Sequence, residues 1–423
     1  MAVEQEVIRG LVEAYEGSLD PFFTASIHNV ARTIVEESTG VKSGQKVLIR
    51  FDPPGIPLVK ELYLASLAKG ADTRFFRREL EKDAQIIPTL DEQGIRDYFN
   101  EEEELINWAD VILTVRGPEN PEVMNNVPPD KYAIYQNRYG QTLERMNSGE
   151  VMWNLFPWPT LYDANKEGLS YEEYFNLVIE ACNQPWKEIK EAQAILKARL
   201  DSGKILELIA NEGDPDKKKR TYLKMSIEGM TFCNSTIKRN FPGSEVFSAP
   251  VLESVEGQIY AAGYYIYSNK LMKGIFLRIE KGRIVEAHAE EGDEHLQFIL
   301  SQTNLIGGEQ PPVGGARYFG EVALGTNPGL TRRFFNDFLN EKVAGSFHMA
   351  IGNCYTINEY DGDAVNVNNG NIPALTPIHW DLTILMHRNA DGSGGGKVIV
   401  DGELIQKNGI FLDEKLAVLN PKF

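Results

Sequence analysis

The spacing of apolar residues changes near Lys204, and this change restricts the folds open to the chain of 423 residues. Before it, apolar runs of strand length alternate with longer helical patterns, as in the run at 47–51 and the helical pattern that ends at Gly70. After it, alternating runs are separated by glycines and short turns. Strands joined by helices form mostly parallel sheets, whereas strands joined by short turns pair antiparallel. We therefore predict an α/β N-terminal half with a doubly wound, mostly parallel sheet, and an α+β C-terminal half with a mixed or antiparallel sheet.

The N-terminal half contains four runs that we interpret as strands, at 47–51, 73–79, 109–117 and 131–136. No glycine-rich phosphate-binding loop follows any of these runs in the sequence, so we predict that this half has no nucleotide site. A helical stretch over 171–203 leads into the second half. The predicted domains are 1–200, an α/β domain with this helical connection, and 201–423, an α+β catalytic domain whose main helix is expected at 329–345.

The charge balance argues against nucleic acid and anionic membranes as partners. The chain has 43 Lys and Arg against 61 Asp and Glu, a net charge of −18, and phosphate contacts need clustered cations. No run of about 18 apolar residues predicts a transmembrane helix, and the acidic N-terminus lacks the features of a secretory signal. The cysteines, Cys182, Cys233 and Cys354, are too widely spaced for a disulfide framework or a zinc clip. We therefore predict a cytoplasmic protein.

Two histidines lie beside other candidate metal ligands. In PIHWDL, His379 and Asp381 are two residues apart, which places both side chains on one face of a strand, where they can bind one cation or two adjacent ones. A hydrogen-bonded His–Asp pair on a sheet surface is the simpler alternative. His348, in SFHMAIGNCY, begins an apolar strand, and a buried core histidine is the alternative there. Tyr355 follows the glycine turn after that strand, where a phenol near a metal can donate to an oxyanion.

Two glutamates interrupt apolar runs. Glu321 lies in RYFGEVALG and Glu245 in NFPGSEVFSAP, and a carboxylate buried in such a run needs a cation or a strong donor. Each glutamate could instead be the outward-facing polar residue of an alternating strand. His288 and His295 lie in an acidic segment, which we assign to a solvated loop. Residue type and spacing leave these alternatives open.

Taken together, these segments resemble the thermophilic aminopeptidase family that contains aminopeptidases T and S. The matching stretches are RNFPGSEVFSAPVLESVEGQI, FGEVALGTNPGL, NEKVAGSFHMAIGNCY and IHWDL, followed by VIVDGELIQKNGIF. The first half is similar to the family's N-terminal domain in VKSGQKVLIR, KGAD and FPWPT. The resemblance covers most of the chain, and EVFSAP, GEVALG and HxxxGxxY in that order are specific to the family.

The resemblance implies a dimeric, cytoplasmic metallo-aminopeptidase that binds two divalent ions (Zn, Co, Mn or Mg) and acts on peptides with a free N-terminus. The metal ligands that it implies by motif are Glu245, Glu321, His348, His379 and Asp381, with Tyr355 counted beside them. Glu341, in the NEK before His348, matches an acidic family position and is a further candidate ligand or neighbour of the ligands. In the expected mechanism, Glu321 or a neighbouring carboxylate takes the proton of the attacking water, and Tyr355 donates to the oxyanion.

Two other functions stay open. A mononuclear iron(II) ring-cleaving dioxygenase of the dihydroxypyridine type resembles the same fold and would use His348, His379 and Asp381 as a facial triad. Glu245 and Glu321 favour the two-metal hydrolase, because the triad does not need them. The third possibility is a non-enzymatic scaffold with a degraded site, and a ligating residue at every implied ligand position argues against it.

Overall fold

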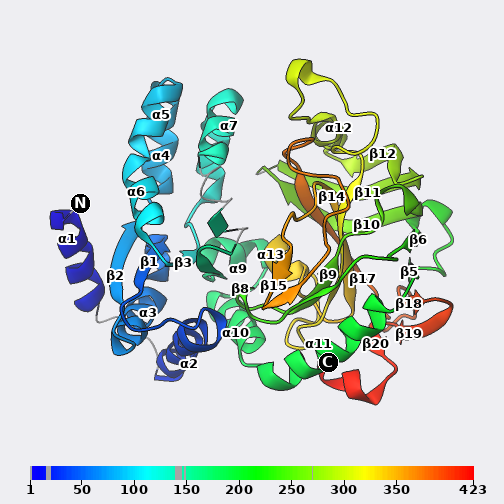
Figure 1. The fold of residues 1–423 in the computed structure, drawn as a ribbon, viewed down its shortest axis with the longest axis horizontal. Helices are drawn as coiled ribbons and strands as arrows, with labels where there is room; N and C mark the ends of the chain where they lie inside the picture. Colours follow the sequence, from blue (N-terminus) through cyan, green and yellow to red (C-terminus); the bar gives the residue numbers. More distant parts are fainter. Residues whose placement is uncertain (1, 16–20, 139–144, 147–148, 269) are drawn as a thin grey trace. The chain divides into compact units, whose positions relative to one another are not determined.

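The computed structural model describes residues 2–15, 21–138, 145–146, 149–268 and 270–423. The chain divides into two compact units (Figure 1). Unit 1 comprises Met1–Asn183 and Ile237–Gly243, and unit 2 comprises Gln184–Thr236 and Ser244–Phe423. Within the described ranges, no helix combines the length and the apolar character that crossing a bilayer requires.

A five-stranded sheet organises unit 1. Its strand order is β2-β1-β3-β4-β8, and every neighbouring pair is parallel. The strands are β1 (Lys46–Phe51), β2 (Asp72–Arg77), β3 (Val111–Arg116), β4 (Met152–Pro157) and β8 (Arg239–Asn240). The chain runs from β1 to β2 and then to β3 on the other side of β1, which is a doubly wound arrangement. The predicted α/β fold of the N-terminal half is confirmed.

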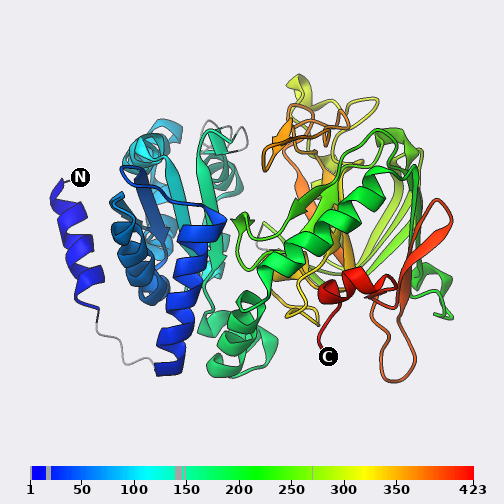
Figure 2. The same cartoon turned by 60° about the horizontal axis from the view of Figure 1, so that its bottom comes forward.

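Helices connect these strands and pack on the sheet (Figure 2). Leu105 and Ile106, for example, pack from one helix against Leu48 of β1 and Ile112 of β3. Among the described residues of unit 1, the α-helices are α1 (Ala2–Glu13), α2 (Pro21–Thr33), α3 (Ile56–Ala68), α4 (Leu80–Ile86), α5 (Glu92–Tyr98), α6 (Asn100–Trp108), α7 (Pro129–Asn137), α9 (Leu161–Glu167) and α10 (Tyr171–Cys182).

The prediction of a strand at 131–136 is wrong. These residues belong to helix α7, and β4 is the fourth strand instead. Pro129 lies in the first turn of α7, where its missing N–H is not needed. Tyr135 packs in a small apolar cluster with Ile95 and Phe99. A short apolar run such as KYAIYQ fits a strand or one face of a helix equally well, and the neighbouring helices decide.

Two antiparallel sheets form most of unit 2, as predicted for the C-terminal half. The larger sheet has the order β12-β11-β10-β6-β5-β18-β19-β20, the smaller sheet has the order β17-β14-β13-β9-β7, and β15 pairs with β16. Their strands are β5 (Ile205–Ala210), β6 (Thr221–Ser226), β7 (Cys233–Ser235), β9 (Glu245–Ser248), β10 (Glu256–Tyr267), β11 (Lys270–Glu280), β12 (Arg283–Glu291), β13 (Phe319–Gly325), β14 (Ser346–Gly352), β15 (Glu359–Tyr360), β16 (Asp363–Ala364), β17 (His379–Leu385), β18 (Gly396–Val400), β19 (Glu403–Lys407) and β20 (Ile410–Phe411).

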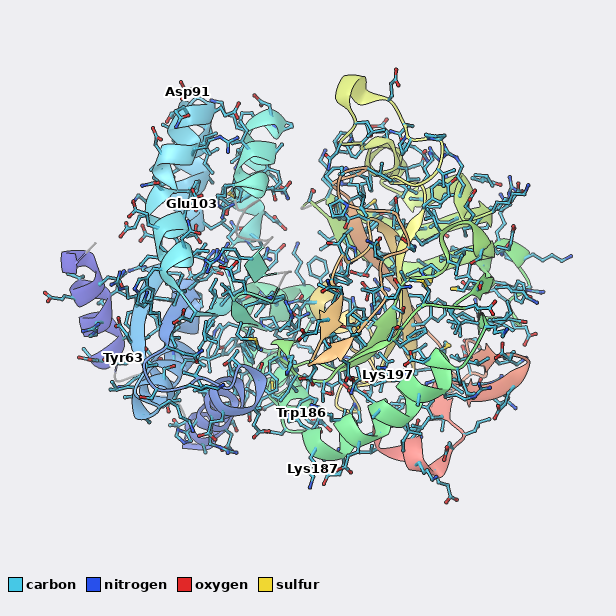
Figure 3. The ribbon with its side chains drawn as sticks, viewed as in Figure 1. Tyr63, Asp91, Glu103, Trp186, Lys187 and Lys197 are labelled. Carbon is cyan, nitrogen blue, oxygen red and sulfur yellow. The ribbon has the colours of Figure 1, made fainter. Side chains whose placement is uncertain are left out.

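The helical stretch predicted at 171–203 is confirmed as α10 and α11 (Trp186–Asp201). Trp186 is buried at the start of α11, whereas Lys187 is exposed (Figure 3). The helix expected at 329–345 is largely wrong, because helix α13 covers Asp337–Asn340 and turns occupy most of the remainder. Asn340 gives one reason. Its side chain accepts a hydrogen bond from the backbone N of Phe334 at 2.7 Å and donates one to the carbonyl oxygen of Phe334 at 2.8 Å, which closes a turn that a continuous helix does not form.

The assignment of His288 and His295 to a solvated loop is also wrong. His288 lies in β12, at the edge of the larger sheet, and its side chain is exposed. His295 lies in α12 (Asp293–Ser301), where Nε2 donates to the carbonyl oxygen of Tyr267 at 2.9 Å. Charged residues are common on edge strands, because they oppose pairing with other chains, and this accounts for the acidic run around these histidines.

Candidate metal centre

Neighbouring strands of the smaller sheet carry the five acidic and histidine residues that the sequence singled out. They are Glu245 on β9, Glu321 on β13, His348 on β14, and His379 and Asp381 on β17. Glu321 and Asp381 lie on opposite sides of β14, at the same register position along it. The sheet therefore brings together five side chains that are far apart in the sequence.

Their ligand atoms form two groups that share one carboxylate. Glu245, Glu321 and His348 form the first group, and Glu321, His379 and Asp381 form the second; within each group one atom per residue lies within 4.8 Å of the others. His348 Nε2 is 3.4 Å from Glu321 Oε1 and 3.5 Å from Glu245 Oε2. His379 Nε2 is 3.2 Å from Glu321 Oε2. Glu321 thus directs one oxygen into each group, as a carboxylate between two adjacent cations does.

Several buried polar atoms of this cluster have no hydrogen-bond partner within the described part of the protein. They are Glu245 Oε2, His348 Nδ1, His379 Nε2 and Asp381 Oδ1. Such atoms are rare, because each costs roughly 1–3 kcal/mol. His379 Nδ1 donates to the carbonyl oxygen of Asn353 at 2.6 Å, which leaves Nε2 with the lone pair of the neutral ring. Imidazole nitrogens combined with carboxylate oxygens suit divalent cations, so the residues fit the metal that the sequence predicted.

The metal-free cluster keeps protons on its histidines. Burial opposes a charged imidazole, but Glu321 and Asp381 outweigh burial and raise the pKa of His348 to about 9 and that of His379 to about 10. Burial would raise the pKa of Glu321, but the two neighbouring imidazoles outweigh burial and lower it. Burial, and next the charge of Glu341, raise the pKa of Asp381. The imidazole protons occupy positions that a divalent cation requires.

Sequence analysis missed Lys342. This side chain is 2% exposed, and Nζ lies 2.6 Å from Glu245 Oε1 and 2.9 Å from Glu341 Oε2. Glu245 therefore has one oxygen held by Lys342 and the other, Oε2, directed toward His348. Burial opposes its charge, but the two carboxylates raise the pKa of Lys342, so it is a buried cation. The run NEK has the composition of an exposed turn, and it carries no signal of this burial.

Glu341 and Tyr355 lie beside the cluster in different ways. Glu341 contacts Lys342 and reaches the two groups through that lysine and through its charge. The ring centroid of Tyr355 is 5.1 Å from that of His379 and 5.4 Å from that of Phe247. Tyr355 is partly exposed, but desolvation of its phenol, and next the charge of Glu321, raise its pKa well above the usual range. The phenol is therefore a protonated hydrogen-bond donor at neutral pH.

Comparisons with known proteins identify relatives that are named as aminopeptidases. Aminopeptidase T of Thermus aquaticus is 38% identical to the chain, over 90% of this chain and 95% of its own length. Aminopeptidase T of Thermus thermophilus is 26% identical, over 85% of this chain and 92% of its own length. The solved structure of wild-type AmpT from Thermus thermophilus has the same fold, with a TM-score of 0.70 at 22% identity, covering 92% of this chain and 100% of that one.

A 2,5-dihydroxypyridine dioxygenase from Pseudomonas putida KT2440 shares the fold less closely. Its TM-score is 0.54 at 13% identity, and the alignment covers 93% of this chain and 99% of that one. The sequence matches the family described as Thermophilic metalloprotease (M29) over residues 23–411, a span that includes every residue of the candidate metal centre. The family resemblance found in the motifs is therefore confirmed: this chain belongs to the thermophilic metalloprotease family, whose members are metal-dependent hydrolases.

Proposed function

We propose that this protein is an aminopeptidase that binds two divalent ions and releases N-terminal residues from peptides. The observation that carries the proposal is the sharing of Glu321 between two groups of candidate ligands, each of which contains buried atoms with no hydrogen-bond partner among the described residues. Family membership and relatives named as aminopeptidases support the activity. In this proposal the catalytic chemistry belongs to the α+β domain at 201–423, and the α/β domain is 1–200.

Each proposed ligand has a role that follows from its position. Glu245 and His348 would hold one ion, His379 and Asp381 would hold the other, and Glu321 would bridge them. When bound, the ions supply Lewis acidity, which polarises a carbonyl and acidifies a water. A carboxylate-rich ligand set does not select zinc strongly, so zinc, cobalt, manganese and magnesium all remain candidates.

The remaining groups of the site move and hold protons. Of the two carboxylate choices for the general base, Glu321 or a neighbour, we favour the neighbour, because both oxygens of Glu321 would face ions. This carboxylate would take a proton from the attacking water and pass it to the leaving amine. Glu341 would support this step through its contact with Lys342 rather than as a ligand. Tyr355 would donate a hydrogen bond to the oxygen that becomes negative in the transition state, and its raised pKa keeps it protonated for that purpose.

A ring-cleaving dioxygenase is the second candidate, since one such enzyme shares the fold. A facial triad needs two histidines and one carboxylate, which His348, His379 and Asp381 would supply. Glu245 opposes this assignment: Lys342 holds one of its oxygens, and the other is buried and faces His348. A buried, oriented carboxylate beyond the triad favours the hydrolase. We further propose a cytoplasmic homodimer, on the family resemblance.

The activity is tested with chelator-treated protein and aminoacyl-p-nitroanilides. Restoring zinc, cobalt, manganese or magnesium should restore hydrolysis, whereas the corresponding N-acetylated substrates should not be cleaved. His379→Ala should remove the restored activity, and His288→Ala, at an exposed histidine of β12, is the matched control that should keep it. The peptidase proposal fails if none of the metals supports hydrolysis, or if the N-acetylated substrates are cleaved equally well.

A further inference from the structure

A cavity lies in unit 1, at the carboxyl ends of β1, β2 and β3. Its volume of about 420 Å³ falls within the range of roughly 300–1,000 Å³ that small-molecule sites occupy. The chain leaves β1 toward β2 on one side and later enters β3 on the other side, so the strand order reverses at this edge. Ligands of doubly wound proteins bind in the crevice at such a reversal. The cavity is therefore where this fold favours a ligand.

The base of the cavity is preformed. Asp52 follows β1 directly and is 1% exposed. Its Oδ2 accepts from the backbone N of Gly117 at 2.8 Å and from Arg78 at 3.2 Å, so one carboxylate joins the segments that follow all three strands. A Cβ at Gly117 would lie 2.6 Å from the carbonyl oxygen of Trp158, which explains why glycine occupies this position. No large rearrangement is needed before a ligand enters.

The backbone around the cavity does not suit a phosphate. Phosphate-binding loops present consecutive backbone N–H groups. Pro53 and Pro54 follow Asp52, and Pro118 follows Gly117, and none of these prolines has an N–H to offer. Recognition must therefore come from side chains.

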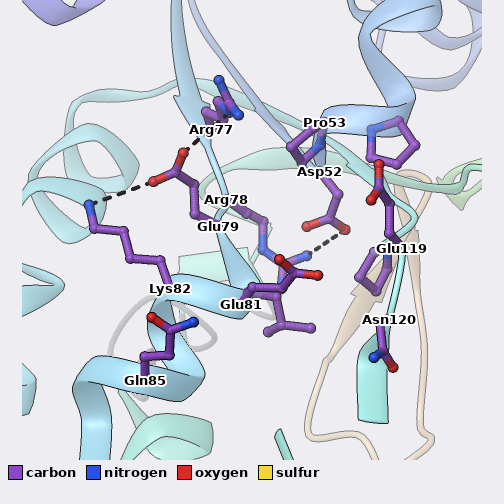
Figure 4. A pocket seen from close by; sticks show the side chains of 13 residues that line it. Asp52, Pro53, Arg77, Arg78, Glu79, Glu81, Lys82, Gln85, Glu119 and Asn120 are labelled. Atoms are coloured by element: carbon purple, nitrogen blue, oxygen red, sulfur yellow. Dashed lines mark hydrogen bonds and ion pairs between the residues drawn. The ribbon is translucent and has the colours of Figure 1, made fainter. Parts of the chain in front are cut away.

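The side chains at the rim carry both signs of charge. Figure 4 shows Arg77, Glu79 and Lys82 on one side, Glu119 on the other, and Glu81 between them in this view. Glu79 is shared by the two cations, at 3.5 Å from Arg77 Nε and 3.6 Å from Lys82 Nζ. Both distances are longer than a charge-assisted hydrogen bond, which is about 2.7–2.9 Å. Arg77 and Lys82 therefore keep N–H donors that can bind another anion. Glu119 has no ion-pair partner among the residues that the structure describes.

From this arrangement we propose that the cavity binds a small zwitterion with a free α-amino group and a free α-carboxylate. The carboxylate lies against Arg77 and Lys82, and the ammonium lies toward Glu81 and Glu119. Free amino acids and short peptides both have this chemistry. The site lies in a different unit from the metal centre, and its assignment does not depend on the peptidase activity.

The first test is saturation-transfer NMR on the full-length protein with a mixture of the twenty free amino acids. We expect transfer to at least one of them, both in the wild type and in His379→Ala, which removes binding that depends on the metal centre. Equilibrium dialysis of that amino acid then gives its Kd. The N-acetyl derivative removes the charge of the α-amino group, and the amide removes the charge of the α-carboxylate. Each should bind at least about tenfold more weakly, since each lacks one charged contact.

Variants place the binding at the cavity. Lys82→Met and Glu119→Gln should each weaken binding about tenfold, whereas Arg96→Met, at an exposed arginine of α5 paired with Glu92, should leave it unchanged. A dipeptide of the bound amino acid, tested on His379→Ala so that it is not hydrolysed, shows whether the free amino acid or the peptide binds more tightly. The proposal is overturned by the absence of saturation transfer, by binding that Lys82→Met leaves unchanged, or by equal binding of the N-acetyl derivative.

Discussion

Replacing Lys342 by methionine tests how the metal centre is held before any metal binds. Lys342 is a buried cation with carboxylates at 2.6 Å and 2.9 Å, and methionine retains most of its volume without its charge. The substitution leaves Glu245 buried without its cation. Removing one partner of a buried ion pair costs about 3–5 kcal/mol, far more than removing an exposed pair.

The magnitude converts into a melting temperature that can be measured. A domain of about 150–250 residues loses roughly 2–4 °C per kcal/mol, so metal-free Lys342→Met should melt roughly 6–20 °C below the metal-free wild type. Differential scanning calorimetry on chelator-treated protein gives the value. Lys197→Met is the matched control, because Lys197 pairs with Asp201 at 2.6 Å in a partly exposed position on α11, where we expect a loss of only about 0.5 kcal/mol.

A double variant separates loss of the pair from loss of packing. Lys342→Met combined with Glu245→Gln leaves no lone charge in the pair, so the double variant should be more stable than the sum of the two single losses predicts. Two results would refute the view that Lys342 holds Glu245 in place. One is that the stability losses of the two single variants add up in the double variant, and the other is that Lys342→Met melts within about 1 °C of Lys197→Met.

Three further predictions follow from the structure. In the metal-free protein the pKa values of His348 and His379 are raised to about 9 and about 10, so protonation of these imidazoles stabilises the folded state. This stabilisation is complete below pH ~6.5, the ordinary pKa of histidine, and is lost as the pH rises through 9 to 10. Calorimetry should show the melting temperature falling over that range. Tyr355→Phe should lower kcat by about 100-fold with little change in metal content, measured by steady-state kinetics with metal analysis; an unchanged kcat removes the proposed oxyanion donor. Gly117→Ala should destabilise unit 1 by about 1–3 kcal/mol in urea unfolding, because its Cβ meets a backbone carbonyl at 2.6 Å; full stability would show that the neighbouring loop yields.

The sequence predicted the class of each half because that information is local. Apolar runs separated by helices or by turns determine whether strands can pair in parallel, and the sheets of both units agree with that pattern. The errors occur where a short segment depends on its neighbours. The run at 131–136 is helical because Tyr135 packs against Phe99, and 329–345 is broken because Asn340 bonds back to Phe334. Neither contact is visible in a pattern of apolar residues.

The candidate site shows the same division. His379 and Asp381 could be paired from their spacing on a strand, since two-residue spacing is a local property. The approach of Glu321 to both of them depends on the register of β13, β14 and β17, which no spacing specifies. The family resemblance supplied that connection. Lys342 was missed because its burial comes entirely from residues distant in sequence.

Counting metal ions per chain tests the central claim most directly. Chelator-treated protein would be equilibrated with zinc, cobalt or manganese, freed of excess metal and analysed for metal and protein concentration. The proposal predicts two ions per chain in the wild type, the loss of one in Glu245→Ala and in Asp381→Ala, and the loss of both in Glu321→Ala, because the two groups share that residue. The proposal would be contradicted if the wild type binds a single ion per chain and Glu245→Ala retains that ion. It would also be contradicted if iron is the only metal that binds.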